Sequence, residues 1–216
     1  MKWSFSGLKE YVNCPRQYNE VKLKQNFSKK VTEQMTYGTV VHKALEDYVR
    51  DGTPLAKNYQ QYKKMVDPLL EIQGERHPER KFALTKDKTP CDFASPDYWV
   101  RGIVDLLIID GDTAYIIDYK TGSAKYPDTK QLKLMALMTF SHHDEIKFIK
   151  AGLLFVAHNT FIDESYSRDD VEKLWKYFQG DLMRLQMSMD TDAWPPNPTP
   201  LCGWCPVSTC QFYKQR

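Results

Sequence analysis

Two carboxylates and a lysine stand in apolar segments of the sequence. Asp118 and Lys120 follow the apolar run at 114–117, and Asp105 interrupts a second apolar run at 98–109. On a β-strand, residues 118 and 120 point to the same face. Charged groups beside buried strands are costly unless something uses them. The pattern therefore indicates either a surface ion pair or a metal-binding carboxylate beside a catalytic lysine.

The two apolar runs are joined by a turn signal. Asp110, Gly111 and Asp112 separate them, and an acidic residue followed by glycine is typical of a tight β-hairpin. We therefore expect the strands at 98–109 and 114–120 to pair in antiparallel fashion. Asp105 and Asp118 lie roughly six residues on either side of the turn. This spacing predicts that the two carboxylates stand opposite each other on one sheet.

Two predicted helices can add side chains to these strands. In the helix predicted at 35–49, Gly38, His42 and Glu46 follow one another at intervals of four residues and share one face. His42 is either a partly buried polar residue or a metal ligand oriented by its neighbours. Gln131 falls in the first turn of a helix predicted at 128–140. It is either solvated or able to reach back over the preceding strand end.

Three cysteines crowd the end of the chain. Cys202, Cys205 and Cys210 lie within nine residues, and Cys14 is the natural fourth ligand for a shared centre. Converging thiolates are typical of a structural zinc site or an iron–sulfur cluster, and the spacing alone leaves both open. Cys91 has no neighbouring cysteine in the sequence. A cluster of this kind would join the two ends of the chain.

The remaining pattern indicates an α/β protein with a mixed sheet flanked by helices. We expect a short helix ending at Val12 and, after Pro15, a second helix at 16–24. Residues 75–80 and 86–97 are predicted loops, and the other expected elements are helices at 58–73 and 169–189 and strands at 81–85, 147–157 and 161–166. The prediction is one domain, residues 1–216, with Cys14 and the tail at 201–216 forming a cluster subregion.

Composition narrows the class of protein. The chain has 216 residues, of which 42% are hydrophobic and 27% charged, with a formal net charge of +2. This profile is typical of one soluble domain and does not by itself indicate nucleic-acid binding. No apolar run approaches the roughly 20 residues that span a bilayer. We expect no membrane association and a cytoplasmic location, in the host cytoplasm if the source is viral.

Taken together, these motifs resemble the PD-(D/E)XK nucleases of the RecB type. Within that family they resemble the iron–sulfur branch that includes the CRISPR-associated exonuclease and the nuclease domain of AddB. The matching segments follow the family order: GTVVH at 38–42 with Glu46, GIVD at 102–105, DYK at 118–120, Gln131, CPRQY at 14–18, and the cysteine tail at 202–210. The resemblance implies a restriction-endonuclease-like core.

The resemblance also implies roles for these residues in metal-dependent hydrolysis of DNA by an exonuclease. It implies these ligands for Mg²⁺ or Mn²⁺: His42, Asp105, Asp118 and the carbonyl of Tyr119. Lys120 would position or deprotonate the attacking water, Glu46 would support the ligands, and Gln131 would position Lys120 or the DNA. Tyr119 or Tyr126 could stack on an unpaired base.

The implied setting is DNA recombination, repair or replication. The partners would be single-stranded DNA or duplex ends, with recombination or helicase proteins and an oligomeric state also possible. The implied cofactor besides Mg²⁺ or Mn²⁺ is a [4Fe–4S] cluster on Cys14, Cys202, Cys205 and Cys210, with Zn²⁺ as the alternative. A competing interpretation is a nonenzymatic DNA-binding module whose nuclease-like fold is stabilised by that Cys₄ site.

Overall fold

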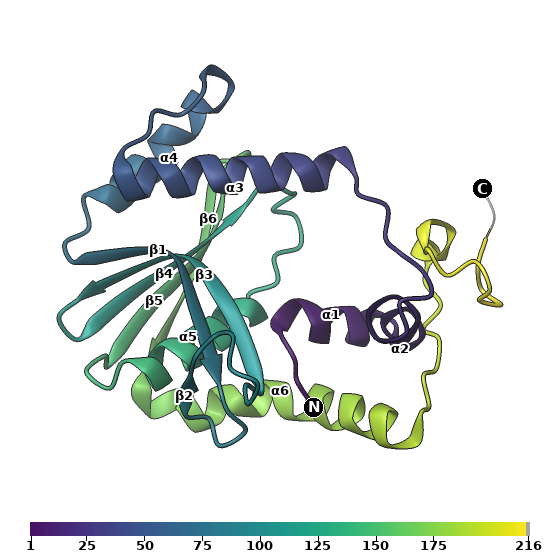
Figure 1. Cartoon of the computed structure of the whole chain (residues 1–216). Helices are drawn as coiled ribbons and strands as arrows, with labels where there is room; N and C mark the ends of the chain where they lie inside the picture. Colours follow the sequence, from purple (N-terminus) through teal and green to yellow (C-terminus); the bar gives the residue numbers. More distant parts are fainter. Residues whose placement is uncertain (215–216) are drawn as a thin grey trace. The chain divides into compact units, whose positions relative to one another are not determined.

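The computed structural model describes residues 1–214 and divides the chain into two compact units (Figure 1). One unit is formed by Thr32–Trp175, and the other by Met1–Val31 together with Lys176–Arg216. No helix in residues 1–214 is both long and apolar enough to cross a bilayer. The assignment of the whole chain to a single nuclease domain stays a prediction.

A mixed sheet forms the centre of the Thr32–Trp175 unit. Within the described residues it has six strands in the order β2-β1-β3-β4-β5-β6, with β4 and β5 parallel and every other neighbouring pair antiparallel. The strands are β1 Glu75–Leu84, β2 Pro90–Cys91, β3 Val100–Asp110, β4 Thr113–Lys120, β5 Phe148–Phe155 and β6 Thr160–Ser167. The sheet confirms the expected mixed α/β class.

The predicted hairpin is formed by β3 and β4. Their pairing runs from Asp110 opposite Thr113 to Leu106 opposite Ile117. Gly111 in the turn has φ +58°, a left-handed conformation that glycine adopts without a steric penalty. The ladder ends at this pair, and Asp105 and Asp118 are the next residues on the two strands; beyond the ladder, Asp105 accepts a hydrogen bond from the main-chain N–H of Tyr119. The hairpin therefore brings the two carboxylates to the same end of β3 and β4.

The first half of β1 corrects the sequence prediction, because residues 75–80 form strand and not loop. Glu75 pairs with Ile109 and Arg80 pairs with Val104. The short β2 covers β1 only at Ala83 and Leu84, so the charged half of β1 lies at an open sheet edge. Charged side chains are common on edge strands because they remain solvated there. β2 itself also lies within the predicted loop at 86–97.

Helices cover both faces of this sheet. The helix α3, Glu33–Asp51, begins at the N-cap Thr32 and ends at Gly52, whose φ is +75°. Its buried Val41, Leu45 and Val49 pack with strand residues of β3, β4 and β5 in one hydrophobic core. The same core includes residues of η2, Lys57–Tyr62, and α4, Lys63–Leu70.

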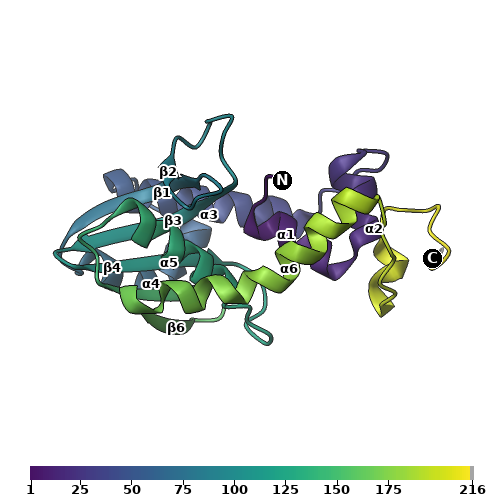
Figure 2. The same cartoon turned by 90° about the horizontal axis from the view of Figure 1, so that it is seen from below.

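The helix α5, Lys130–His142, lies on the opposite face and connects the parallel strands β4 and β5. Figure 2 shows α5 in front of the strands and α3 behind them. Residues 132 and 134–140 of α5 are all buried. The connection places the first turn of α5 beside the end of β4, where Asp118 and Lys120 lie. The short η3, Arg168–Asp170, and the start of α6, Val171–Thr191, complete the unit.

The second unit is built on aromatic packing. Its elements are α1 Phe5–Asn13, α2 Pro15–Tyr18, η1 Asn19–Leu23, the later part of α6, and η4 Pro200–Trp204. Trp3 packs on Phe178 with ring centroids 5.8 Å apart, and the Tyr11 hydroxyl bonds to the Ser188 hydroxyl at 2.9 Å. Cys14 has an extended backbone, with φ −163°. The helical conformation is therefore interrupted between α1 and α2, as the Cys14–Pro15 pair predicts.

Candidate active site

The end of β4 carries a connected polar group formed by Asp118, Lys120 and Gln131. The Gln131 Nε2 donates to Asp118 Oδ1 at 2.7 Å, and Lys120 Nζ donates to Gln131 Oε1 at 3.1 Å. Lys120 also forms an ion pair with Asp118. Asp118 and Lys120 therefore share a face, as the strand pattern predicts. Gln131 reaches back from the first turn of α5, which was one of its two expected positions.

Asp118 is a buried acid held among charges. It is 2% exposed, whereas the Lys120 side chain is 32% exposed. Burial, together with the charge of Asp105, raises the pKa of Asp118 to about 6, although Lys120 and His42 act in the opposite direction. The ionised carboxylate is therefore less favourable here than it is for an aspartate in water. A nearby cation would stabilise it.

Asp105 links the two strands to α3. Its Oδ2 accepts a hydrogen bond from the Tyr119 main-chain N–H at 2.7 Å and lies 3.4 Å from His42 Nδ1. Burial alone would lower the pKa of His42, but the bond to Asp105 and the charges of Asp105 and Asp118 raise it overall. His42 thus lies among the carboxylates, which supports its expected place in the site.

Gly38 explains how α3 approaches the catalytic strand. A Cβ at this position would lie only 3.2 Å from Thr121 Oγ1, in the loop that follows Lys120. The glycine therefore permits close packing between the helix and the strand end. Glu46, one turn beyond His42, forms ion pairs with Lys43 at 3.3 Å and with Arg50. Its carboxylate is partly neutralised within α3.

Glu79 is a further carboxylate that the sequence analysis missed. Pro78 pairs with Leu106 and Arg80 with Val104, so Glu79 lies opposite Asp105 at a position where the regular pairing is interrupted. Its φ of +52° is unusual for a glutamate. Burial, followed by the charges of Asp105 and Glu46, raises the pKa of Glu79. Within residues 1–214 no hydrogen bond or ion pair neutralises this side chain, and like charges opposite each other destabilise a sheet.

The sequence offered no signal for Glu79, because a charged segment without alternation resembles a loop. Its position emerges only from the pairing of β1 with β3. A second feature nearby is the Tyr119 side chain, which is 1% exposed. Its buried hydroxyl lacks a hydrogen-bond partner in the part of the chain that the structure describes. This burial rules out Tyr119 as a base-stacking surface, whereas Tyr126 is 83% exposed.

These groups fit a divalent cation. Within residues 1–214 no set of three or more His, Cys, Asp or Glu side chains already has metal-binding geometry. The neighbourhood nevertheless combines an excess of carboxylates, an unpaired Glu79 and an orphaned Tyr119 hydroxyl. Carboxylate oxygens with one imidazole suit Mg²⁺ or Mn²⁺. A cation would offset the repulsion between Asp105, Asp118 and Glu79.

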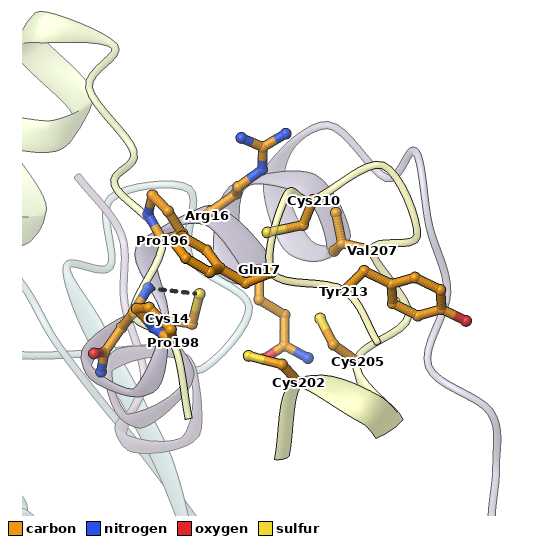
Figure 3. Close-up of a pocket in the computed structure, with 12 residues that line it drawn as sticks. Cys14, Arg16, Gln17, Pro196, Pro198, Cys202, Cys205, Val207, Cys210 and Tyr213 are labelled. Atoms are coloured by element: carbon orange, nitrogen blue, oxygen red, sulfur yellow. Dashed lines mark hydrogen bonds between the residues drawn. The ribbon is translucent and has the colours of Figure 1, made fainter. Parts of the chain in front are cut away.

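The four predicted cysteine ligands converge in the second unit. Cys14, Cys202, Cys205 and Cys210 line one small cavity (Figure 3). Main-chain N–H groups donate to two of the sulfurs, from Asn197 to Cys14 at 3.5 Å and from Thr199 to Cys202 at 3.3 Å. Burial and the three neighbouring thiols raise the pKa of Cys205.

The four thiols and the N–H groups around this cavity suit a metal centre that is bound by thiolates. N–H groups aimed at sulfur stabilise thiolate charge, and hydrogen bonds to sulfur tune iron–sulfur clusters. The four thiols do not form a preset metal site among the described residues, so the expected cluster is not shown. Cys91 lies on β2 and is not part of this cavity. The structure thus separates four gathered thiols from one isolated thiol.

Comparisons of the whole chain with known proteins found a matching family model and similar solved structures. The family model described as the PD-(D/E)XK nuclease superfamily matches residues 2–210. The crystal structure of a protein named "Putative exonuclease" from Eubacterium rectale is similar with a TM-score of 0.55 and 10% identity, covering 100% of this chain and 88% of that one. The crystal structure of SSO0001 gives a TM-score of 0.48 and 13% identity, with 99% and 88% covered. No curated protein matches the chain.

Proposed function

The chain belongs to the PD-(D/E)XK nuclease superfamily, and on that premise we propose that it is a metal-dependent deoxyribonuclease. The observation that carries the proposal is the group at the end of β4, in which Gln131 bonds to both Asp118 and Lys120 beside Asp105. A carboxylate pair and a lysine in one partly open site suit phosphodiester hydrolysis.

The ligands proposed for Mg²⁺ or Mn²⁺ are those with oxygen or imidazole donors around Asp105: His42, Asp105, Asp118, Glu79 and the Tyr119 carbonyl. Such an ion, when bound, supplies charge neutralisation and an activated water. Asp118 is the most deeply buried of these carboxylates, and its raised pKa means that a cation competes with a proton for it below about pH 6. Glu46 supports this set from one turn further along α3.

Lys120 is the proposed catalytic cation. Its ammonium is held by Asp118 and Gln131, and one third of its side chain remains accessible to substrate. From this position Lys120 can donate to a phosphate oxygen or orient the attacking water. Gln131 holds the ammonium in place, because its side-chain carbonyl oxygen accepts a hydrogen bond from Lys120.

The proposed mode is exonucleolytic, in DNA recombination, repair or replication. Its support is the family, together with the fold shared with a protein named as an exonuclease. Single-stranded DNA or a duplex end is the proposed substrate. Helicase or recombination proteins, or further copies of the chain, are proposed partners of such an activity.

The second proposed cofactor is a [4Fe–4S] cluster on Cys14, Cys202, Cys205 and Cys210, with Zn²⁺ as the alternative. Its support is the shared cavity and the N–H groups aimed at two of the sulfurs. Such a centre would join segments 188 residues apart, from residue 14 to residue 202. A cross-link of that kind restricts the unfolded chain and couples metal affinity to folding.

The deciding experiment is cleavage of labelled DNA with each end blocked in turn. Single-stranded and duplex substrates, blocked at the 5′ or the 3′ end, are incubated with Mg²⁺ or Mn²⁺ and resolved on a sequencing gel. A product ladder that disappears when one end is blocked supports an exonuclease. Products from DNA that is blocked at both ends would instead indicate an endonuclease. DNA binding without metal-dependent products would favour the nonenzymatic module.

A further inference from the structure

A group of cations and aromatic rings lies on β1, β3 and the loop after β2. The members of this basic–aromatic patch are Lys81, Phe93, Tyr98 and Arg101. The Arg101 guanidinium lies 4.6 Å from the Tyr98 ring centre and 5.0 Å from that of Phe93, and Lys81 Nζ lies 5.7 Å from the Phe93 centre. The rings therefore hold two positive charges close together.

The two cations contact aromatic rings, but among residues 1–214 neither Lys81 nor Arg101 takes part in an ion pair. Lys81 is exposed and Arg101 is half-buried, so both can reach a ligand. Holding a cation against a ring limits its rotamers, which lowers the entropy lost when it binds. Two adjacent unpaired cations of this kind suit an anionic partner.

The patch lies on the same side of β1 and β3 as Asp105 and Glu79, the two carboxylates that these strands contribute to the candidate active site. Lys81 pairs with Ile103, and Glu79 stands opposite Asp105 in the same register. Residues two apart on a strand lie on one face, so Asp105, Ile103 and Arg101 form a row. Phe82 and Gly102 point the other way, toward His142 and Met138 of α5. In Figure 1, β1 and β3 continue beyond α3 toward β2.

The distance along β3 between Asp105 and Arg101 determines how many nucleotides a bound strand needs to contact both. Four residues separate Asp105 from Arg101, which is about 13 Å at roughly 3.3 Å per residue. A nucleic-acid strand with about 3.4 Å between phosphates covers that length in about four nucleotides, and an extended strand needs fewer. Ile103, 36% exposed, offers an apolar surface between the two ends of the row.

We propose that the basic–aromatic patch binds the sugar–phosphate backbone of a single nucleic-acid strand a few nucleotides from the scissile phosphate. This inference rests on the proposed nuclease function and extends it to a specific binding surface. A single strand fits because the cations occupy only two neighbouring β-strands, which are about 5 Å apart. Lys81 and Arg101 each contact a phosphate, and Phe93 positions both.

The test compares Lys81→Gln/Arg101→Gln with Lys150→Gln. Lys150 is a matched control, because it is also exposed and lies over an aromatic ring, Tyr115, at 5.6 Å, but it is on β5. Binding of fluorescent oligothymidylate is measured by anisotropy in chelator across a salt series. Removing two phosphate contacts should lower the slope of log K against log salt by about 1.4 and weaken binding roughly 20-fold at 0.1 M salt.

The double Gln variant should lose no affinity for a dinucleotide, which is too short to reach the patch, and Arg101→Lys should retain much of the salt slope because it keeps the charge. Equal salt slopes for the double variant and Lys150→Gln would overturn the inference. So would a loss of affinity confined to duplex DNA. Melting temperatures equal to that of the wild type confirm that each variant is folded.

Hydrolysis of bis(p-nitrophenyl) phosphate separates this inference from the proposed function. This small phosphodiester cannot span the patch, so the double variant should cleave it at the wild-type rate. If the wild type binds oligothymidylate through the patch but hydrolyses no phosphodiester with Mg²⁺ or Mn²⁺, the nuclease function fails and the binding surface stands. If the wild type hydrolyses both substrates and the patch variants bind normally, only the binding surface fails.

Discussion

Asp118→Asn should change the pH dependence of stability in the metal-free protein. The folded state raises the pKa of Asp118 from 3.8 to about 6, first through burial and then through Asp105. A raised acid pKa means that the folded state binds the proton more tightly than the unfolded state does. This group therefore contributes stability below about pH 4, and the contribution is lost as pH rises through 6.

The expected size follows from the pKa values. Each pKa unit corresponds to about 1.4 kcal/mol, so a difference of roughly two units is worth about 3 kcal/mol in full. Between pH 4.5 and pH 7.5, about 2 kcal/mol of this is lost. The substituted amide would carry no titrating proton and could still accept from Gln131, so the variant should lack this component. Lys120 would lose a partner but is accessible enough to be hydrated.

The assay is urea denaturation of chelator-treated protein, followed by circular dichroism at several pH values. The difference in unfolding free energy between wild type and Asp118→Asn should change by about 2 kcal/mol across this range, with the variant gaining relative stability as pH rises. Adding Mg²⁺ should stabilise the wild type most at high pH, where the carboxylate is free of its proton. Parallel pH profiles for the two proteins would refute the argument.

Four further predictions concern single side chains. Lys120→Ala should lower single-turnover cleavage by roughly 100-fold or more while leaving DNA affinity within a few-fold, and near-normal turnover would reject its catalytic role. Glu79→Gln should raise the Mg²⁺ concentration needed for half-maximal cleavage by about tenfold, which a metal titration measures; an unchanged midpoint would remove Glu79 from the ligands. His42→Ala should shift the same titration, and the relative activity with Mn²⁺ and Mg²⁺ should change as well, unless the imidazole lies outside the metal site. Protein purified without oxygen should contain iron and sulfide. The Cys210→Ser variant should lose both and melt at a lower temperature, whereas Cys91→Ser should keep both and melt at the wild-type temperature. Zinc without iron would support the Cys₄ zinc site, and protein without bound metal would reject both kinds of centre.

Local sequence predicted the hairpin that brings the two aspartates together. The Asp110–Gly111 turn and the apolar runs on both sides specify antiparallel pairing, because turn geometry and alternation set the register over short distances. The helical periodicity of α3 likewise placed His42 and Glu46 one turn apart. The break at Cys14–Pro15 depends on the restriction that a proline places on the residue before it, and this is visible in the sequence.

The cysteine pattern predicted which thiols would gather, but not how. Three cysteines close together in sequence need a fourth, and Cys14 was the natural candidate. The structure brings all four to one cavity, while the positions of the N–H groups of Asn197 and Thr199 depend on how the tail folds against α1 and α2.

The positions of the charged groups in the site and the pKa of Asp118 depend on tertiary structure. The charged segment at 75–80 has no strand alternation, so only its pairing with β3 places Glu79 opposite Asp105. Burial beneath α5 and the two bonds of Gln131 determine the environment of Asp118, and neither is encoded in residues next to it in sequence. Local sequence specifies which chemical groups are present and that their two strands form a hairpin. Their protonation and their partners depend on long-range packing, because burial and charge act through space rather than along the chain.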